Sequence, residues 1–474
     1  MNKIVKLWLS LLILAGSINL NAQKQWTLQD CINYALQNNI QIKRQELQSN
    51  IAKNNYQQSK MEILPNLNGG GSHTWNFGRN VDRYTNEIVN NNVTSDNFYL
   101  QSSLNLFSGF QIINSVQQNK YLLEASLQDY EKAKNDISIQ IATVFLQVLS
   151  GEEALDIAQK QFDVTHLQLE KTKKLVEVGN KARGDLLEMQ AQEANDKYNI
   201  TVANNNLKIS YITLVQLLEL KSVDDFKIKI PDTIAIDHSN VLATVDDIYK
   251  EAEAKLPEIK SAENQLRGYE KGLSVTRGQL LPTLSLVGTL GTGYSNARQR
   301  TDSLMPVANT IGFVNDDPNL RVINHSVIPI SGKYPFFSQL SDNESKSIAF
   351  NLTIPIFNQF QVRKNVKNAK IRVNDQNYNL QQAKKSLYAE IQKAHANALA
   401  AFDQYNSANE AVVANEEVFK YNQQKFDVGM ISSVDYDIVK NNLTKAKSNL
   451  IQAKYDYIFK IKVLDFYKGI PIVL

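Results

Sequence analysis

The sequence has almost no cysteine: Cys31 is the only one among 474 residues, so no disulfide can form within the chain. Its apolar surroundings are typical of a small buried side chain rather than a reactive thiol. Beyond the first 22 residues, the chain also lacks any run of 18 consecutive apolar residues. A membrane-spanning helix in the mature protein is therefore excluded, and if the protein spans a membrane it must do so with strands.

The patterns typical of enzymes are missing as well. The five histidines have no metal-ligand spacing, and the chain contains no GxSxG or Walker sequence and no pair of cysteines. Basic and acidic side chains are nearly balanced, with 51 Lys and Arg against 48 Asp and Glu, which gives no indication of nucleic-acid binding. We therefore expect no enzymatic activity, no cofactor, no metal site and no nucleic-acid partner.

The beginning of the chain has the pattern of an export signal. Lys3 and Lys6 precede an apolar run from Leu7 to Ala15, and a short polar stretch ends at Ala22. Such a segment is a secretory signal peptide and is too short to remain as a membrane-spanning helix. Residues 1–22 are therefore predicted to be a signal peptide.

The rest of the chain contains the same pattern twice. Thr27-Leu-Gln-Asp30 opens a helix that is predicted to end near Leu64-Pro65. Thr244-Val-Asp-Asp247 opens a second helix that is predicted to end at Leu281-Pro282, 217 positions later. The spacing from Thr to Leu-Pro is identical in the two copies.

A second set of matches has a different spacing. Leu106-Phe107 is repeated by Ile356-Phe357, 250 positions later, and one insertion of 33 residues between Pro282 and Ile356 reconciles the two spacings. A tandem duplication of this length predicts one large supersecondary unit used twice. We expect a first structural repeat over residues 23–243 and a second over residues 244–474.

Proline and glycine, the main helix breakers, are missing from long stretches. Residues 361–428 contain neither, and a helix of that length would extend about 100 Å at about 1.5 Å per residue. Residues 111–178 contain only one glycine, and their apolar residues recur in steps of three and four, interrupted by Thr165 and Thr172. This is the seam of a coiled coil.

Each of these long helices is predicted to end at a Val-Gly pair and to return as an antiparallel helix, because glycine readily adopts the left-handed conformation that ends a helix. The two pairs are Val178-Gly179 and Val428-Gly429. Each repeat thus contains a long helical hairpin, over residues 111–220 and 361–468. Heptads alone leave open an isolated coiled-coil rod.

Four segments alternate between apolar and polar residues, which is typical of strands with one buried face. They form two predicted strand pairs, within residues 66–107 and within residues 283–357, and the last run extends to Ile356. Each run has the length of a tilted membrane strand. Polar loops, over residues 79–95 and 296–345, are expected to join the members of each pair.

Four strands cannot close a barrel, and an open strand edge cannot face lipid. If the strands lie in a membrane, several chains must share one barrel, and repeated head-to-tail contacts would close them into a ring. This argument predicts a cyclic oligomer without fixing the number of subunits. The alternative is a pair of soluble hairpins packed on a core.

The order of these features resembles the TolC-like outer membrane efflux protein family, over essentially the whole mature chain. The resemblance implies an α+β membrane protein: a transmembrane β-barrel shared by a homotrimer, with four strands per chain, continuing into a long periplasmic antiparallel α-helical coiled-coil barrel. It implies an exit channel in the outer membrane, in contact with its lipid, that works with a periplasmic adaptor protein and an inner-membrane transporter to export small molecules or proteins. The linker between the repeats, residues 221–243, reads as a short strand and a loop.

The resemblance also implies a pore entrance at the hairpin tips. Asp435 and Asp185 match acidic positions of the family, and Glu188 could supply a further charge. In the family, the resemblance implies a polar lock formed at two positions and a second acid at a third. In this chain those positions carry Phe426, Ile431 and Ile438, so apolar packing is predicted to hold this entrance shut.

The Val178-Gly179 and Val428-Gly429 tips are expected to contact the adaptor, with simple turn formation as the alternative. For the two aspartates, the alternative is a role in starting the helix that follows the tip. The alternative for the whole protein is a periplasmic coiled-coil adaptor or scaffold without a pore of its own.

Overall fold

The computed structural model describes residues 25–81, 86, 88–89, 92–224, 226–230 and 243–472, so the predicted signal peptide lies outside the described residues. The chain divides into two compact units. The helical unit comprises residues 1–54, 120–268 and 374–474, and the sheet unit comprises residues 55–119 and 269–373.

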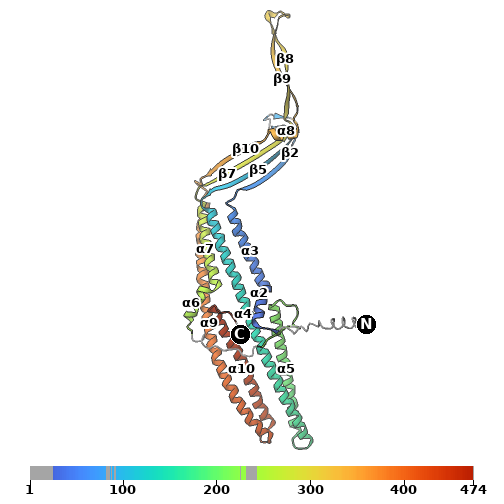
Figure 1. Cartoon of the computed structure of the whole chain (residues 1–474), viewed down its shortest axis with the longest axis vertical. Helices are drawn as coiled ribbons and strands as arrows, with labels where there is room; N and C mark the ends of the chain where they lie inside the picture. Colours follow the sequence, from blue (N-terminus) through green and yellow to red (C-terminus); the bar gives the residue numbers. More distant parts are fainter. Residues whose placement is uncertain are drawn as a thin grey trace, which may run out of the picture. The chain divides into compact units, whose positions relative to one another are not determined.

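Long helices dominate the fold (Figure 1). They are α2 (Leu28–Asn38), α3 (Ile40–Met61), α4 (Gln111–Glu177), α5 (Arg183–Leu217), α6 (Val245–Lys255), α7 (Pro257–Gly278), α9 (Gln361–Asp427) and α10 (Ser433–Tyr467). The first four and the last four have the same lengths in the same order, namely 11, 22, 67 and 35 residues. This correspondence confirms the internal duplication.

The helix predicted to run without a break from Thr27 is wrong in one respect, because each copy is divided into two helices. The first copy breaks at Asn39, whose ψ is 130° and whose side-chain Oδ1 accepts a hydrogen bond from the Gln41 N–H at 2.9 Å. The second breaks at Leu256, whose ψ is 136° because the ring of Pro257 disfavours helical backbone in the residue before it. Asn39 and Leu256 occupy equivalent positions in the two repeats.

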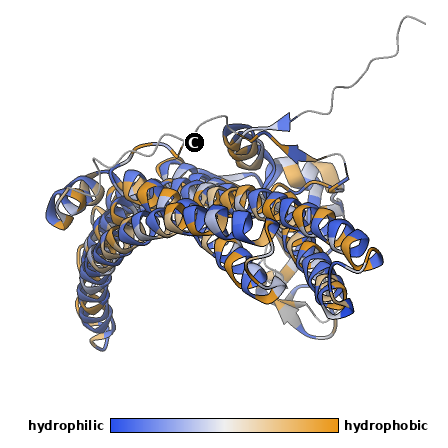
Figure 2. Cartoon of the chain, turned by 90° about the horizontal axis from the view of Figure 1, so that it is seen from below, coloured by the Kyte–Doolittle hydropathy of each residue, from blue (hydrophilic) through white to orange (hydrophobic). Residues whose placement is uncertain are grey.

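The coiled-coil seam is confirmed by burial within the helical unit. Ile137 and Ile141 of α4 are buried, as are their counterparts Leu387 and Ile391 of α9. α2 packs on the seam of the first repeat and α6 on that of the second. Figure 2 shows hydrophobic and hydrophilic residues alternating along these helices, as expected when one stripe of each is buried. Among the described residues, no helix combines the length and the apolar character needed to cross a membrane.

The sheet unit contains a four-stranded antiparallel sheet with the order β10-β7-β5-β2. Its strands are β2 (Asn66–Asn76), β5 (Val93–Ser108), β7 (Thr283–Ser295) and β10 (Ser345–Thr353). The four strands confirm the predicted pairs, and β5·β7 is the joint between the two repeats. The predicted end of the last strand at Ile356 is wrong, because β10 ends at Thr353, two residues before Pro355.

The connection predicted as a polar loop over residues 296–345 is wrong as well. It contains a long antiparallel ribbon and a short helix: β8 (Gln299–Phe313), the 3-10 turn Val314–Asp316, β9 (Arg321–Lys333) and α8 (Phe336–Asp342). Both faces of the ribbon are largely exposed, so its residues do not alternate between buried and exposed along the strands. Pro306 and Pro329 also lie within its strands, where proline normally argues against a strand.

Two shorter strand pairs complete the described structure. The connection over residues 79–95 contains β3 (Asn80–Val81) and β4 (Ile88–Val89). In the helical unit, β1 (Gln25–Trp26) pairs in parallel with β6 (Lys227–Ile228), which is the short strand expected in the linker. Residues 231–242 of that linker lie outside the described residues.

Candidate functional site

The hairpin tips form two nearly identical turns, at the same end of the helical unit in Figure 1. Gly179 has φ 78° and Gly429 has φ 75°, which is the left-handed conformation that glycine adopts without strain. The Asn180 N–H donates to the Leu175 carbonyl and the Met430 N–H to the Lys425 carbonyl, both at 2.8 Å. These are Schellman-type ends that satisfy the last carbonyls of α4 and α9.

The tips expose apolar side chains. Val178 and Val428 are each 69% exposed, and Met430 is 75% exposed. A Cβ added to Gly179 or Gly429 would meet no heavy atom within 4 Å, so backbone conformation rather than space requires glycine at these positions. The sequence therefore predicted the turn correctly, and the exposed valines make the tip an available apolar surface.

Asp435 lies in the first turn of α10, where it takes part in the cap of the helix. The Asp435 N–H donates to the Ser432 hydroxyl at 3.1 Å, and that hydroxyl donates to the Asp435 carboxylate at 2.7 Å. The carboxylate is exposed and lies near the positive end of the helix dipole. This geometry is that of a capping residue, and it also leaves the negative charge in contact with solvent.

Asp185 and Glu188, both at the start of α5, converge on one residue of the second hairpin. The buried Ser433 hydroxyl lies 3.0 Å from Asp185 Oδ1 and 2.7 Å from Glu188 Oε2. The two predicted acids of the first repeat therefore lie together, and they join the beginning of α5 to the beginning of α10. Asp435 takes no part in this contact.

Of the three apolar residues predicted at the entrance, Phe426 is the one that packs closely at the hairpin tip within this chain. Its ring is buried and stacks on Tyr436 with 4.5 Å between centroids, and Lys181 Nζ from the other tip lies 4.2 Å from the Phe426 centroid. Ile431 is half-buried, whereas Ile438 is 53% exposed within this chain.

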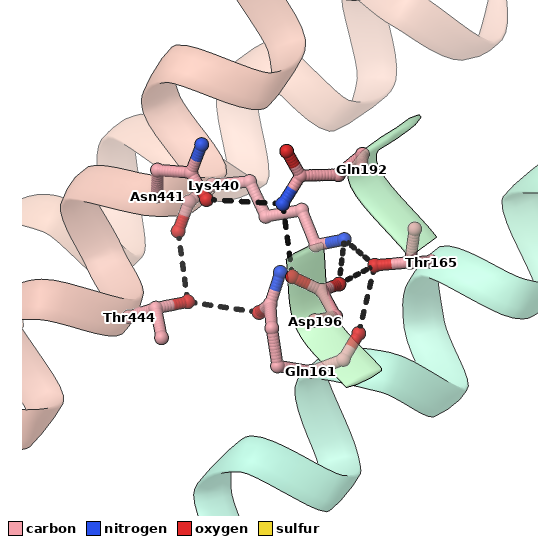
Figure 3. Close-up of polar contacts among 7 residues, drawn as sticks. All are labelled: Gln161, Thr165, Gln192, Asp196, Lys440, Asn441 and Thr444. Carbon is pink, nitrogen blue, oxygen red and sulfur yellow. Dashed lines mark hydrogen bonds and ion pairs between the residues drawn. The ribbon is translucent and has the colours of Figure 1, made fainter. Parts of the chain in front are cut away.

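A buried polar cluster about three turns from the tips links the two hairpins (Figure 3). Lys440 Nζ of α10 lies 3.7 Å from Asp196 Oδ2 of α5, and the two side chains are 3% and 2% exposed. The Thr165 hydroxyl of α4 contacts both of them. Gln161 Oε1 accepts a hydrogen bond from Thr444 at 2.8 Å, which adds a second link between the hairpins.

The charges of this cluster are perturbed by burial. Desolvation lowers the pKa of Lys440, although the carboxylates of Asp196 and Asp437 oppose that effect. Desolvation also raises the pKa of Asp437 to about 6, helped by Asp196 and Glu188 and opposed by Lys440. One oxygen of Asp437, Oδ1, is buried without a hydrogen-bond partner. A protonated Asp437 would therefore relieve a buried negative charge.

Sequence reasoning did not find this cluster, although one signal was present. Thr165 is one of two threonines that interrupt the apolar seam, and a polar residue at a seam position often pairs with a buried partner. Asp196 and Lys440 are spread over helices α5 and α10, so their proximity depends on how the hairpins pack. Among the residues whose placement is described, no group of three or more His, Cys, Asp or Glu could hold a metal ion.

Comparison with known proteins identifies the family of this chain. The family model for "Outer membrane efflux protein" matches residues 31–219 and 248–460, one segment in each repeat. This chain belongs to the outer membrane efflux protein family. The efflux protein is 22% identical to TolC of Escherichia coli (strain K12) over 432 residues, covering 89% of this chain and 77% of TolC. It is 21% identical to TolC of Vibrio cholerae over 434 residues, covering 92% of this chain and 88% of that protein.

Solved structures share the fold. A structure of CusC matches the efflux protein with a TM-score of 0.73 and 16% identity over 96% of both chains. The Campylobacter jejuni CmeC outer membrane channel matches with a TM-score of 0.73 and 17% identity over 93% of this chain and 85% of that one.

With the family established, the protein is an efflux exit channel of the outer membrane. The alternative of a pore-less periplasmic adaptor or scaffold is not favoured.

Proposed function

We propose that three copies of this efflux channel form a trimer with one shared twelve-stranded barrel. The support is the sheet: among the described strands, β2 and β10 each pair on one side only, and four strands are too few to close a barrel. An unpaired strand edge is not tolerated in the hydrocarbon layer, so neighbouring copies would complete the wall. This is the observation on which the proposal depends.

The helical hairpins would then form the tunnel on the periplasmic side, and their tips would bind a periplasmic adaptor. The exposed Val178 and Val428, beside the left-handed Gly179 and Gly429, offer an apolar surface at each turn. An inner-membrane transporter would supply the energy. One relative is named as the cation efflux system protein CusC, 22% identical over 275 residues that cover 55% of that protein, which supports work within a larger efflux system.

The acids at the tips would line the entrance of the tunnel. Three copies of Asp435, joined by Asp185 and Glu188, would place like charges around a narrow opening and favour cations. Phe426 packed on Tyr436, with Ile431 and Ile438 nearby in sequence, would supply the apolar contacts of a closed entrance. In the trimer, the exposed Ile438 would pack against a neighbouring chain.

Two experiments test this proposal. In the first, the purified full-length channel in planar bilayers should give a small, cation-favouring conductance. In the second, cell envelopes are washed with high salt without detergent, and release of the protein would contradict a channel that lies in the membrane.

For the adaptor, a photo-cross-linking amino acid at position 428 in the native cell should capture a periplasmic adaptor of the membrane-fusion class. Tyr198, also 69% exposed but on the side of α5, is the matched control position. Equal capture from both positions would contradict tip docking.

A further inference from the structure

The joint between the two repeats shows how one repeat pairs with the next. Within the four-stranded sheet, β5 is the second strand from the first repeat, and β7 is the first strand from the second repeat. They pair antiparallel, with Phe98 opposite Thr292 and Leu100 opposite Leu290. The two outer strands are equivalent to these two. β10 is the second sheet strand of its repeat, as β5 is, and β2 is the first sheet strand of its repeat, as β7 is. The edges of the sheet are therefore related to each other as β5 is to β7.

The strand pairs β2·β5 and β7·β10 have the same register, so each strand position in one repeat has an equivalent position in the other. The 217-residue spacing relates β2 to β7, and the 250-residue spacing relates β5 to β10. Asn66 pairs with Ser103 in the first hairpin, and Thr283 pairs with Thr353 in the second. Applying the two spacings to the first pair gives the second pair without any shift. The duplication is therefore exact in strand register as well as in helix length.

We propose that β10 of one copy pairs antiparallel with β2 of the next copy in the register of the β5·β7 joint. The pair Phe98 and Thr292 becomes Ile348 and Trp75 of the neighbouring copy. The pair Leu100 and Leu290 becomes Phe350 and His73 of that copy. This inference rests on the ring assembly proposed above, and it adds the residues that meet at each joint of the ring.

The faces of the strands agree with this register. At the β5·β7 joint, Leu100 lies opposite Leu290 and Phe98 lies opposite Thr292 on one face. In the proposed joint, Ile348 meets Trp75 and Phe350 meets His73, so at these positions each joint has one apolar pair and one apolar side chain opposite a polar one. A slip by one residue would place Ile348 opposite a polar residue, Thr74 or Asn76, and would turn one strand's apolar face to the wrong side.

The exposure of the edge strands fits a missing neighbour. Ile348 is 79% exposed and Trp75 is 64% exposed, whereas Phe98 at the equivalent position of the internal joint is 40% exposed. The strands also fit by size. β2 contains the glycines Gly69 and Gly71, which already accommodate large side chains of β5 on one side. In the proposed register, Leu352 of the neighbouring copy lies opposite Gly71. Because glycine has no side chain, this position has room for Leu352 on the side away from β5.

Disulfide cross-linking of the full-length channel in outer membranes tests the register. The background is Cys31→Ala, and the test variant carries Ile348→Cys with Trp75→Cys. Oxidation should give bands of two and three subunits on a non-reducing gel, because directly opposite Cβ atoms lie about 4.5–5.5 Å apart. The internal control is Phe98→Cys with Thr292→Cys, the equivalent pair, which should cross-link within one chain and give no larger species.

Two further variants move the register by two residues while keeping the face: Ile348→Cys with His73→Cys, and Ile348→Cys with Phe77→Cys. Their Cβ atoms would be diagonal neighbours, about 7–8 Å apart, and the bands should be weak or lost. If an intact ring gives strong bands with a shifted pair, or none with the test pair while the internal control reacts, the register is wrong and the ring stands. If every variant stays a single subunit by mass before oxidation, the ring itself is wrong.

Discussion

Lys440 Nζ lies 3.7 Å from Asp196 Oδ2 in the interior of the helical unit, and this ion pair joins the second helical hairpin to the first. Both side chains are almost fully buried, and the Thr165 hydroxyl between them completes the contact. A buried ion pair contributes less to stability than its attraction suggests, because both charges lose their hydration. Removing only one of the two partners would leave the other charge unpaired in an apolar seam.

Removing one partner of this pair should therefore lower the stability of the folded protein strongly. Lys440→Met leaves the Asp196 carboxylate buried without its cation and should reduce the free energy of unfolding by about 3–5 kcal/mol. Lys440→Met combined with Asp196→Leu removes both charges and should recover most of that loss. Thermal unfolding followed by circular dichroism measures both changes. A double variant as unstable as the single one would mean that packing, not charge, holds the hairpins together.

A matched control lies one heptad further along α10. Lys447 pairs with Glu416 at 2.8 Å, but the side chains are 38% and 49% exposed. Because exposed pairs contribute about 0–1 kcal/mol, Lys447→Met should change the unfolding temperature little.

The stability of the helical unit should also depend on pH through Asp437. Its pKa in the folded chain is about 6, above the ordinary value of 3.8, because burial disfavours the charged form. The folded state therefore binds this proton more tightly than the unfolded state, and its contribution to stability falls as pH rises from about 4 to about 6.

Asp437→Asn removes this dependence, so the variant should be more stable than the original chain at pH 7.5, with the difference vanishing near pH 4. Unfolding temperatures across that range measure the difference. A difference that does not change with pH would contradict the assignment.

Gly429 should be required for the tip of the second hairpin. Gly429→Val forces a β-branched residue into a left-handed backbone conformation, which costs about 1–2 kcal/mol. We expect adaptor-dependent export to fall more than assembly of the channel. Gly184→Val is the control, because Gly184 also has open space around it but no left-handed φ. Equal loss of export and assembly in Gly429→Val would point to a folding role alone.

The two interpretations of Asp435 can be separated by charge. Asp435→Asn keeps an oxygen that can accept from the Ser432 hydroxyl but removes the negative charge. If Asp435 lines the entrance, the cation preference of the channel in planar bilayers should decrease while the unfolding temperature is nearly unchanged. Asp435→Ala should lose both the charge and the cap interaction. Unchanged ion selectivity in both variants would leave Asp435 with a capping role only.

The parts of the fold that could be predicted from the sequence are those set by local patterns. Repeated spacing revealed the duplication, glycine marked the tips at positions 179 and 429, and alternation located the four strands of the sheet. The ribbon of β8 and β9 was missed because both of its faces are exposed, so no alternation distinguishes it from a loop. The break at Asn39 was missed because its cap depends on one asparagine side chain within a helical pattern.

The candidate site could be predicted only in part for a related reason. Phe426 was expected to pack at the tip, and it stacks on Tyr436, which local sequence places on the returning helix of the same hairpin. Asp196 and Lys440 belong to different hairpins, about 240 residues apart in the chain, and only tertiary packing brings them together. Burial of a charged pair runs against the usual preference of these residues for solvent, so composition gives no signal for it.

The central claim is that one chain supplies too few strands to close a barrel, so that copies must complete it. Native mass spectrometry of the full-length channel released from detergent tests this most directly. The account predicts a single species with three times the subunit mass that conducts ions when returned to a bilayer. A conducting species with the mass of one subunit would contradict it.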